Sequence, residues 1–498
     1  MKINERIEQL LKHLSDNMYE RKHIIALTFL GALSGTNTFL LGSPGTAKSL
    51  ISRKISQAFE QPKYFEYLMN RFSTPEEVFG PVSIKALKED KYTRKIENYL
   101  PNADFAFLDE IWKSSPAILN ALLTLVNEKL FKNGDELVLV PLKALVSASN
   151  EIPPENQGLE ALYDRFILRL IVKPIEDKDN FLNLIGSKPS SSNVDMDPQL
   201  LIKEDEWKTW LNEIHKVTFS SEINNVILMI RKLISELPDD QRVYVSDRRW
   251  QRAAYLLKAA AFFNGRKEVL LSEIFLLKYC LWNKEESFSE ITQIIEKSIG
   301  LIGIGSGVDV SALLLEKQRL DKEITTELYF TEDIYDTEKI YDGLDYYPLY
   351  CERRKKNLYI KVTDNSLNQW VNAIDSNGNE DHDFEYKFDG SGSFQLRDYW
   401  SQKTVFTPKV RYKKGTRKTN INKRLVDALM SEVQEIQQGF SQAEQHVIDQ
   451  HESLETKFSS LFIQKSELKF LLNSINEQLN VLETNIQDCE RLKALCDN

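Results

Sequence analysis

The segment from Gly42 to Ser49, with the sequence GSPGTAKS, constrains the fold of this chain more than any other. An apolar run, 38–41, precedes it, and residues 50–55, whose apolar side chains recur at helical spacing, follow it. This order predicts a strand, a tight loop and a helix. Such a loop turns several backbone N–H groups toward one point, and the helix N-terminus adds partial positive charge there. The loop therefore suits a phosphate group.

The side chains of this loop also suit a bound nucleotide. Lys48 can reach the outer phosphates of a nucleotide, and the Ser49 hydroxyl can ligate Mg²⁺. Ala47 departs from the general pattern, which has glycine before the lysine. The alternative is an ordinary Gly/Pro-rich turn between a strand and a helix. We expect these residues to contact the nucleotide: Gly42, Ser43, Pro44, Gly45, Thr46, Ala47, Lys48, Ser49 and Leu50.

Two carboxylates follow a second decisive apolar run, 105–108. Asp109 and Glu110 stand at the end of what the pattern predicts to be a central strand. In a nucleotide hydrolase of this build, Asp109 would hold Mg²⁺, and Glu110 would orient and activate the attacking water. The alternative is that both acids cap the helix that begins near 114–116. The phosphate loop earlier in the chain favours the catalytic interpretation.

Two polar residues later in the chain are further candidates. Asn150 ends a predicted strand, 144–150, where it could touch the attacking water or the terminal phosphate. It could also simply begin the next loop, where asparagine is common. Arg165 could reach the nucleotide of a neighbouring subunit and stabilise charge on the transferring phosphoryl group, with Arg169 as the second choice. A single arginine is more often solvated or ion-paired, so its position after the other motifs carries this interpretation.

A third arginine opens a later helix. Ser246 is the expected N-cap, and Arg248 lies in the first turn, where a lid domain could turn it onto the γ-phosphate. Arg249 and Arg252 compete for this role. At least one of the three arginines could pair only with acids.

The composition narrows the class of protein. A length of 498 residues predicts two to four domains, and a net charge of −10 argues against a protein that coats nucleic acid. The four cysteines form no CxxC pair and the six histidines show no ligand spacing, so neither a zinc site nor a disulfide framework is indicated. No signal peptide opens the chain, and no apolar run approaches about 18 residues. We therefore expect a soluble, cytoplasmic protein without a membrane span.

The patterns predict four domains: a nucleotide-binding αβα core (1–195), an all-helical lid (196–300), a discontinuous helical bundle (301–328 with 416–498) and a small β-rich insertion (329–415). Within the core we expect hairpins at 82–96 and 130–141, and over 177–198 a flexible connector. Heptad-like apolar stripes over 429–454 and 468–489 predict two long antiparallel helices.

A basic stretch lies within the last two domains. It holds nine Lys or Arg residues over 403–424 and no acid. We favour a solvated linker over a docking patch for an acidic partner or nucleic acid.

Taken together, these motifs resemble the AAA+ ATPases, and within them the MoxR family. The resemblance covers 1–282 and rests on Gly42–Ser49, Phe105–Glu110, Asn150, Asp164–Phe166 and Ser246–Arg248. The runs Glu66–Pro81 and Tyr244–Trp250 look like those of the regulatory ATPase variant A (RavA) branch. Beyond residue 308 the resemblance rests on layout. The implied fold is an α/β P-loop AAA+ core, a parallel sheet with helices on both faces, plus an all-α lid. A helical bundle that carries a β-rich insertion would follow.

The resemblance also implies roles. Lys48 would bind the phosphates of ATP, Ser49 and Asp109 would hold Mg²⁺, and Glu110 would activate water. Asn150 would be sensor 1, Arg165 the arginine finger that acts on a neighbour, and Arg248 sensor 2.

Members of the family form hexameric rings and often work with a partner that carries a von Willebrand factor A domain. We therefore expect a ring-shaped, Mg²⁺-dependent ATPase that remodels client proteins in a chaperone-like way, with the β-rich insertion as the client-binding part. Two alternatives stay open: a nucleic-acid-stimulated AAA+ motor, which the acidic net charge disfavours, and a nucleotide-gated scaffold.

Overall fold

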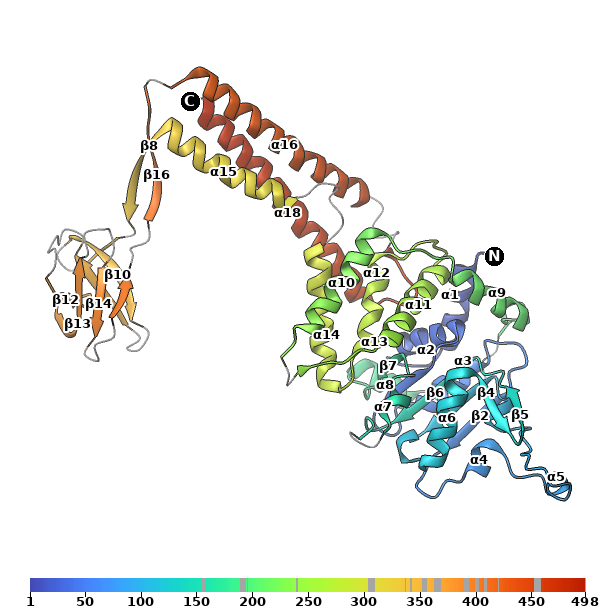
Figure 1. Cartoon of the computed structure of the whole chain (residues 1–498). Helices are drawn as coiled ribbons and strands as arrows, with labels where there is room; N and C mark the ends of the chain where they lie inside the picture. The colour runs from blue at the N-terminus through green and yellow to red at the C-terminus, as the bar shows by residue number, and fades with distance from the viewer. Residues whose placement is uncertain are drawn as a thin grey trace. The chain divides into compact units, whose positions relative to one another are not determined.

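The computed structural model describes residues 1–154, 158–188, 194, 196–238, 241–302, 310–335, 337–340, 343–351, 356–361, 369–388, 394–398, 403–406, 410–419, 421–451 and 458–497. The chain divides into two compact units (Figure 1). Unit 1 comprises Met1–Gly307 and Glu444–Val481, and unit 2 comprises Val308–Ala443 and Leu482–Asn498. Two long helices, α16 (Lys423–His451) and α18 (Lys465–Asp497), contribute residues to both units. The four domain boundaries expected from the sequence stay predictions.

Unit 1 contains a five-stranded parallel sheet with the strand order β2-β3-β6-β1-β7. Its strands are β1 (Thr38–Leu41), β2 (Tyr64–Leu68), β3 (Phe105–Asp109), β6 (Ala144–Ser149) and β7 (Leu168–Ile171). Strands β1 and β3 are buried along almost their whole length, which explains why each is a continuous apolar run in the sequence. Because the carboxyl ends of parallel strands meet at one edge, the loops after β1, β3 and β6 converge there.

Local capping contacts explain where several helices around this sheet begin and end. Helix α2 ends at Gly35, whose φ of 68° is the left-handed conformation of a C-cap. Thr74 and Glu77 form a capping box at the start of α4. The helices of this part are α1 (Ile3–Leu14), α2 (Lys22–Ser34), α3 (Lys48–Ser56), α4 (Pro75–Phe79), α5 (Ile84–Leu87), α6 (Pro116–Glu128), α7 (Glu160–Tyr163) and α8 (Lys178–Gly186).

Of the two hairpins expected in the core, one is confirmed and the other is wrong. Strands β4 (Leu130–Asn133) and β5 (Glu136–Leu139) pair around Gly134, whose φ is 70°. The segment 82–96 instead folds into the short helix α5, and only Val82 and Arg94 form a β-bridge. The cause is local, because the Ser83 side chain accepts a hydrogen bond from the Ala86 N–H and so caps a helical turn.

The flexible connector expected over 177–198 is also wrong in its first half, which forms α8. The Asp177 carboxylate accepts a hydrogen bond from the Asn180 N–H over 2.9 Å and starts this helix. None of the residues of α8 is buried, although four of them are large and apolar. Residues 189–193 and 195 lie outside the described part of the chain.

The lid is helical, as expected. Its helices are α9 (Glu204–Ile214), α10 (Ser221–Ser235), α11 (Asp247–Phe263), α12 (Leu271–Ile274), α13 (Lys278–Leu281) and α14 (Glu285–Ile302). Ser246 caps α11 as predicted, because its Oγ accepts a hydrogen bond from the Arg249 N–H over 3.1 Å. None of the described helices in either unit combines the length and apolar character that a membrane crossing needs.

Unit 2 contains a helical bundle made by α15 (Val310–Leu328) and parts of α16 and α18, which lie side by side (Figure 1). Ion pairs connect them: Lys317 Nζ lies 2.8 Å from Asp488 Oδ2, and Arg319 Nη2 lies 2.6 Å from Glu432 Oε2. The apolar stripe predicted for α16 is buried where the structure describes it, and Leu454 lies outside that part. The stripe predicted for α18 alternates between buried and half-buried residues. Buried members include Leu429, Val433, Phe440, Ile475, Leu482 and Cys489.

The β-rich insertion is confirmed between α15 and α16. Strands β8 (Tyr329–Tyr335) and β16 (Val410–Arg417) form an antiparallel ribbon. A seven-stranded antiparallel sheet lies between them in the chain, with the order β15-β14-β13-β12-β11-β10-β9. Its strands are β9 (Glu338–Lys339), β10 (Asp345–Cys351), β11 (Lys356–Lys361), β12 (Val371–Ile374), β13 (Glu380–Phe388), β14 (Phe394–Asp398) and β15 (Lys403–Phe406).

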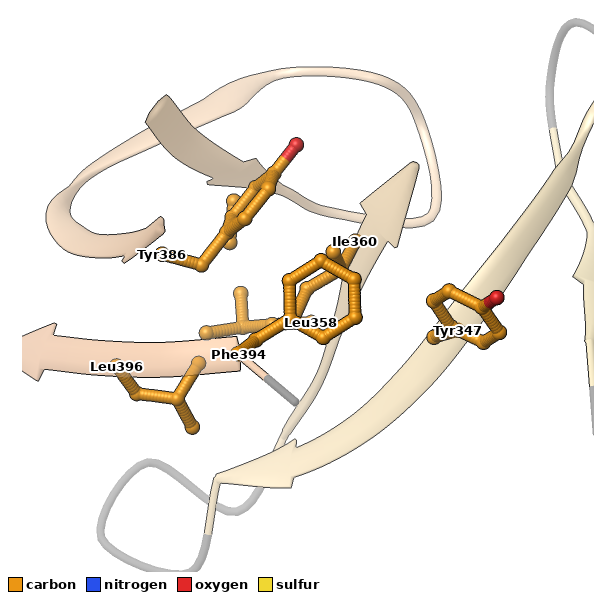
Figure 2. Packing of buried hydrophobic residues seen from close by; sticks show 7 residues of the cluster. Tyr347, Leu358, Ile360, Tyr386, Phe394 and Leu396 are labelled. Atoms are coloured by element: carbon orange, nitrogen blue, oxygen red, sulfur yellow. The ribbon is translucent and has the colours of Figure 1, made fainter. Parts of the chain in front are cut away.

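The sheet of the insertion has its own hydrophobic core. Figure 2 shows residues of this cluster, which come from neighbouring strands. Within each strand they alternate, as Leu358 and Ile360 do, because successive side chains of a strand point to opposite faces. The cluster consists of Tyr347, Leu358, Ile360, Ala373, Tyr386, Phe394 and Leu396.

The basic stretch 403–424 is not the linker that we favoured. It contains β15, the whole of β16 and the first residues of α16, while Lys409 lies outside the described residues. In the ribbon, Lys413 stands opposite Glu332 in register. A basic run without acids can therefore form a strand, because backbone groups make the hydrogen bonds between strands. Here the acidic residues belong to the partner strand, β8.

Candidate nucleotide site

The phosphate-binding loop joins β1 to α3 and is tightly packed between two other strands. The Gly42 N–H donates to the Ser149 carbonyl oxygen over 3.0 Å, which ties the loop to β6. A Cβ at Gly42 would lie 2.3 Å from the carbonyl oxygen of Val172, so only glycine fits there. The Thr46 hydroxyl donates to the Ser43 carbonyl oxygen over 2.9 Å and closes the loop on itself.

Ala47, the departure from the general motif, occupies the left-handed region with φ 68° and ψ 25°. This conformation costs an alanine roughly 1–2 kcal/mol. Glycine at this position would avoid that cost, which explains why the general motif has glycine there. Strain of this kind at a loop that faces a ligand is typical of functional sites.

Lys48 is directed into its own loop. Its Nζ donates to the carbonyl oxygens of Gly42 (2.7 Å) and Ser43 (3.0 Å). Burial lowers the pKa of Lys48, and the charges of Asp109 and Glu110 act in the opposite direction. The ammonium group is thus held at the centre of the loop, within electrostatic range of both acids.

The acid pair follows β3, two strands away from β1 in the sheet. Burial raises the pKa of Asp109, while the charge of Lys48 opposes this shift. Glu110 has φ 52° and ψ 42°, a left-handed conformation that is uncommon for a residue with a side chain. Its Oε2 lies 3.2 Å from Lys113 Nζ and 3.4 Å from Ser149 Oγ. The structure therefore brings Lys48, Asp109 and Glu110 together, although they are far apart in the sequence.

Three residues complete this edge of the sheet. Ser49 lies half-buried in the first turn of α3, and Asn150 is exposed directly after β6. Ser149, which the sequence did not single out, is fully buried and places its hydroxyl beside the Glu110 carboxylate. Its only sequence signal is the position at the end of the strand between β1 and β3.

A cavity of about 290 Å³ lies directly beside the phosphate loop. Residues 43–47 and Leu50 line one side of it. Arg21 supports the rim, since its Nε donates to the Thr46 carbonyl oxygen over 3.3 Å. The apolar lining was missed in the sequence analysis, because it comes from the turn before α2, from the end of β7 and from α8: Met18, Tyr19, Pro174, Ile175, Phe181 and Leu184.

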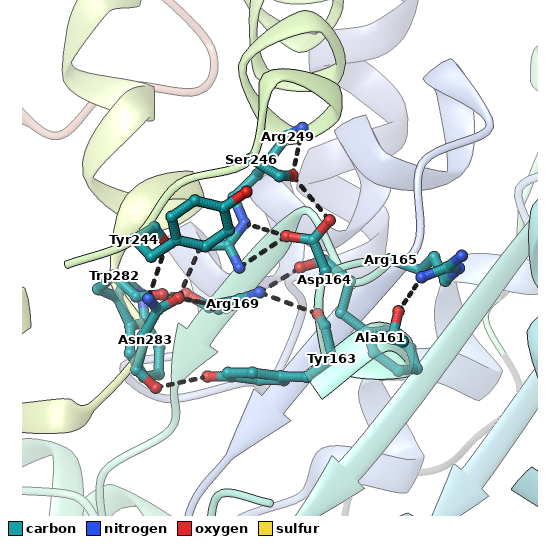
Figure 3. Close-up of polar contacts among 11 residues, drawn as sticks. Ala161, Tyr163, Asp164, Arg165, Arg169, Tyr244, Ser246, Arg249, Trp282 and Asn283 are labelled. Atoms are coloured by element: carbon teal, nitrogen blue, oxygen red, sulfur yellow. Dashed lines mark hydrogen bonds and ion pairs between the residues drawn. The ribbon is translucent and has the colours of Figure 1, made fainter. Parts of the chain in front are cut away.

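The arginines of the core and the lid form a separate network, which Figure 3 shows. Asp164 accepts hydrogen bonds from Ser246 Oγ (2.8 Å) and Arg249 Nε (3.0 Å), and Arg249 Nη2 lies 2.9 Å from the same carboxylate. Arg249 is 3% exposed and also donates to Asn283 Oδ1 over 2.7 Å. Of the three lid arginines, Arg249 is therefore the one that pairs with an acid.

Arg169, the second choice for an arginine finger, is fully buried (Figure 3). It donates to the carbonyl oxygens of Tyr163, Phe166 and Trp282. The guanidinium therefore holds β7 to the end of α13 within its own chain, and it cannot reach another subunit while these bonds exist.

Arg165 and Arg248 lie within electrostatic range of each other. Arg165 Nη1 donates to the Ala161 carbonyl oxygen, and Arg165 Nε is buried without a hydrogen-bond partner among the described residues. Burial lowers the pKa of Arg248, the charges of Arg165 and Arg252 lower it further, and Asp164 opposes them. The charged groups that shift Arg248 thus belong to this cluster and not to the phosphate loop.

The donor set at the sheet edge fits Mg²⁺ together with a nucleotide. Among the described residues, no three His, Cys, Asp or Glu side chains gather closely enough to hold a metal by themselves. Mg²⁺ in nucleotide sites usually takes one or two protein ligands and completes its shell with phosphate oxygens and water. Ser49 and Asp109 could supply these ligands.

Comparisons with known proteins agree with this geometry. Residues 5–204 match the model of the MoxR domain in the MoxR–vWA–beta-propeller ternary systems, and residues 222–295 match that of an AAA lid domain. An uncharacterized protein of Methanocaldococcus jannaschii is 34% identical over 294 residues, which cover 59% of this chain and 74% of that protein. A second one is 36% identical over 292 residues, 58% of this chain and 75% of that protein.

Two further matches have lower sequence identity. A structural protein of Acidianus two-tailed virus is 24% identical over 308 residues, which cover 56% of this chain and 50% of the viral protein. A crystal structure of a protein of Cytophaga hutchinsonii, provisionally named an ATPase, has a TM-score of 0.47 at 21% identity. That match covers 60% of this chain and 94% of the other.

Proposed function

This chain belongs to the MoxR family of AAA+ ATPases, and from this membership we propose that it hydrolyses ATP with Mg²⁺ and uses the energy to remodel partner proteins. The observation that carries the proposal is the convergence of Lys48, Asp109 and Glu110 at one edge of the sheet. A phosphate-binding cation and a pair of carboxylates at such an edge are what phosphoryl transfer to water requires.

In this proposal Lys48 and the backbone N–H groups of the loop bind the β- and γ-phosphates. The ammonium group already points at the loop centre, where its bonds to Gly42 and Ser43 could be exchanged for phosphate oxygens. Ser49 and Asp109 would hold Mg²⁺, which supplies neutralisation of phosphate charge when bound. Asp109 would bind the metal as a carboxylate, and the nearby Lys48 favours that charged form.

Glu110 would orient the attacking water and accept its proton at Oε2. Lys113 and Ser149 hold this oxygen at 3.2 and 3.4 Å, so the carboxylate has a defined direction. Asn150, exposed at the end of β6, would contact the same water or the terminal phosphate. The base of the nucleotide would lie in the cavity of about 290 Å³, whose apolar walls suit a purine ring.

We further propose that Arg165 and Arg248 serve the nucleotide of a neighbouring copy. Their place in the cationic cluster, apart from Lys48, supports action on a second molecule. A head-to-tail contact of this kind generates a closed ring when the rotation closes, and the family resemblance implies six copies. The runs Glu66–Pro81 and Tyr244–Trp250 support assignment to the RavA branch.

The proposed partners follow from the matched domain and from the layout of the chain. The matched MoxR domain is described in systems with a vWA protein, so we propose a partner with a von Willebrand factor A domain. The β-rich insertion has its own core and is the part that we propose to bind the client.

The Glu110→Gln variant tests the proposal. We expect kcat for Mg²⁺-dependent phosphate release to fall roughly 100-fold or more, because the base is lost. Binding of a fluorescent ATP analogue should stay within about threefold, whereas Lys48→Ala should lose binding itself. Wild-type turnover in the Glu110→Gln variant, or a wild-type chain without Mg²⁺-dependent hydrolysis, would refute the proposal. A scaffold that needed binding alone would keep its cellular activity in this variant.

A further inference from the structure

Two pairs of residues that are consecutive in the sequence meet in the network around Asp164. Asp164 and Arg165 follow each other in the core, and Arg248 and Arg249 follow each other in the lid. The inner members, Asp164 and Arg249, form the ion pair, which is anchored further by Ser246 (Figure 3). Because Arg165 and Arg248 are covalently next to this pair, the pairing of the inner members brings the outer members together.

Arg165 and Arg248 would repel each other if no other contact held them close. Arg165, Arg248 and Arg252 all carry positive charge, and Arg252 lies one helical turn after Arg248, on the same side of α11. The one acid that shifts Arg248, Asp164, is already bonded to Arg249 and Ser246. The cations that act on Arg248 thus outnumber the acid that does, and the buried Arg165 Nε has no hydrogen-bond partner in the described part of the chain. Such a cluster is suited to an anion.

The Asp164–Arg249 ion pair lies beside open space. A cavity of about 710 Å³ lies between the core residues around Asp164 and Arg165 and the lid segment around Tyr244 and Ser246. Tyr244 itself is 75% exposed. The ion pair is thus a direct contact between the two segments and helps to set the position of the lid arginines relative to Arg165.

We infer that Asp164 and Arg249 are positioning residues, which hold Arg165, Arg248 and Arg252 together as one site for the terminal phosphates of a nucleotide bound to a second copy of this chain. The inference rests on the proposed ATPase function and deepens it. It adds Arg252 to the residues that contact phosphate, and it makes the core–lid contact the part of each subunit that prepares the neighbour's site.

A double-mutant cycle tests whether Asp164 acts through Arg165. We expect Asp164→Asn to lower kcat roughly 10- to 100-fold, as a misplaced group does. KM for ATP should stay within about twofold, since the subunit's own phosphate loop is untouched. The double variant Asp164→Asn/Arg165→Ala should lose less activity than the product of the two single losses, because the part of the Asp164 effect that passes through Arg165 is already lost. Effects that multiply in the double variant would overturn the inference, because Asp164 would then act independently of Arg165.

Subunit mixing separates positioning from a merely structural role. Asp164→Asn copies keep an intact phosphate loop, and Lys48→Ala copies keep intact arginines. If the arginines serve the neighbour, mixed rings should hydrolyse ATP faster than the two separate preparations together. An absence of any gain from mixing would overturn the inference. A wild-type chain that does not hydrolyse ATP would instead refute the proposed function, so the two failures are distinguishable.

Two further variants keep the test valid if Asp164→Asn folds poorly. Arg249→Lys keeps the charge but loses the two-point contact with the carboxylate, and Arg252→Ala removes one cation without touching the ion pair. Both should lower kcat several-fold and regain activity on mixing with Lys48→Ala copies. Glu206→Gln, which weakens the ion pair with Arg6 elsewhere in unit 1, is the matched control and should keep the wild-type kcat. A control that loses as much activity as Arg249→Lys would overturn the inference.

Discussion

Arg169 and Arg249 donate to the same oxygen. Arg169 Nη1 lies 2.9 Å and Arg249 Nη1 2.7 Å from Oδ1 of Asn283, and the Asn283 amide donates to the Tyr244 carbonyl oxygen over 2.8 Å. One guanidinium belongs to the core and the other to the lid. Asn283 thus joins the buried arginine of β7 to the arginine that holds Asp164, which makes this region the joint between the two parts of unit 1.

Arg169→Met tests the structural role of the buried arginine. Loss of the guanidinium leaves the carbonyl oxygens of Tyr163, Phe166 and Trp282 without this donor, and also removes its stacking 3.6 Å from the Tyr163 ring centroid. We expect the free energy of unfolding to fall by roughly 3 kcal/mol, measured by denaturant unfolding. Arg165→Met, at a half-exposed position, should change the free energy of unfolding by about 1 kcal/mol or less. The same variant should abolish most ATP hydrolysis. Equal losses of stability would contradict the distinction between the two arginines.

The cavity beside the phosphate loop predicts a pair of variants within α8. Phe181 lines the cavity, whereas Leu182, which is 60% exposed on the same helix, does not. Loss of an aromatic wall costs about 1.5–3 kcal/mol of apolar burial, so Phe181→Ala should raise KM for ATP roughly 10-fold or more. Leu182→Ala should leave KM unchanged, and neither variant should change kcat much. Similar KM values in both variants would refute a role of α8 in nucleotide binding.

The conformation of Ala47 predicts opposite effects of two substitutions. Ala47→Gly suits the φ of 68° and should bind ATP at least as tightly as the wild type. Ala47→Val places a β-branched residue at a positive φ, where it is a genuine outlier. We expect it to destabilise the loop by about 1–2 kcal/mol and to weaken ATP binding roughly 10-fold, measured by titration with a fluorescent analogue. Unchanged binding in Ala47→Val would show that the left-handed conformation is not needed.

The buried histidine of α2 predicts a pH dependence of stability. Burial lowers the pKa of His23 from 6.5 to about 4, and its Nε2 lies 2.9 Å from the Tyr279 hydroxyl. As the pH falls below 6.5, the unfolded chain takes up a proton at this residue, and the folded chain does so only near pH 4. The folded state should therefore lose up to roughly 2 kcal/mol between pH 7 and 5 through this residue.

His23→Gln is the variant that checks this effect. Glutamine can keep a hydrogen bond to Tyr279 but does not titrate, so the free energy of unfolding should depend less steeply on pH over the same range. Identical slopes for the variant and the wild type would assign the pH dependence to other groups.

The sequence predicted the parts of this protein that are determined locally. The strand, loop and helix around Gly42–Ser49 and the strand before Glu110 depend on residues within a few positions of one another, and both are confirmed. The mistakes at 82–96 and 177–198 have a common cause, because both segments are polar in composition but begin with a side-chain cap at Ser83 and Asp177. A search for caps would have found both helices.

The roles of the arginines could not be predicted from the sequence in the same way. Arg248 and Arg249 are adjacent and chemically identical, and the difference between them arises because Asp164 meets only one of them. That contact joins positions 85 residues apart in the chain. The lining of the cavity by α8 is equally non-local, since it depends on where the chain runs after β7.

The ribbon formed by β8 and β16 determines how the β-rich insertion can change in evolution. Tyr329 stands opposite Arg417, and just beyond them the Lys418 N–H donates to the Leu328 carbonyl oxygen over 3.0 Å. The polypeptide thus leaves α15 and returns toward α16 at neighbouring points. A gene rearrangement that lengthened, exchanged or deleted the sheet beyond the ribbon would leave the ends of α15 and α16 in place. After a deletion, a two-residue Asn-Gly turn could connect β8 to β16. The insertion could then evolve independently of the rest of the chain.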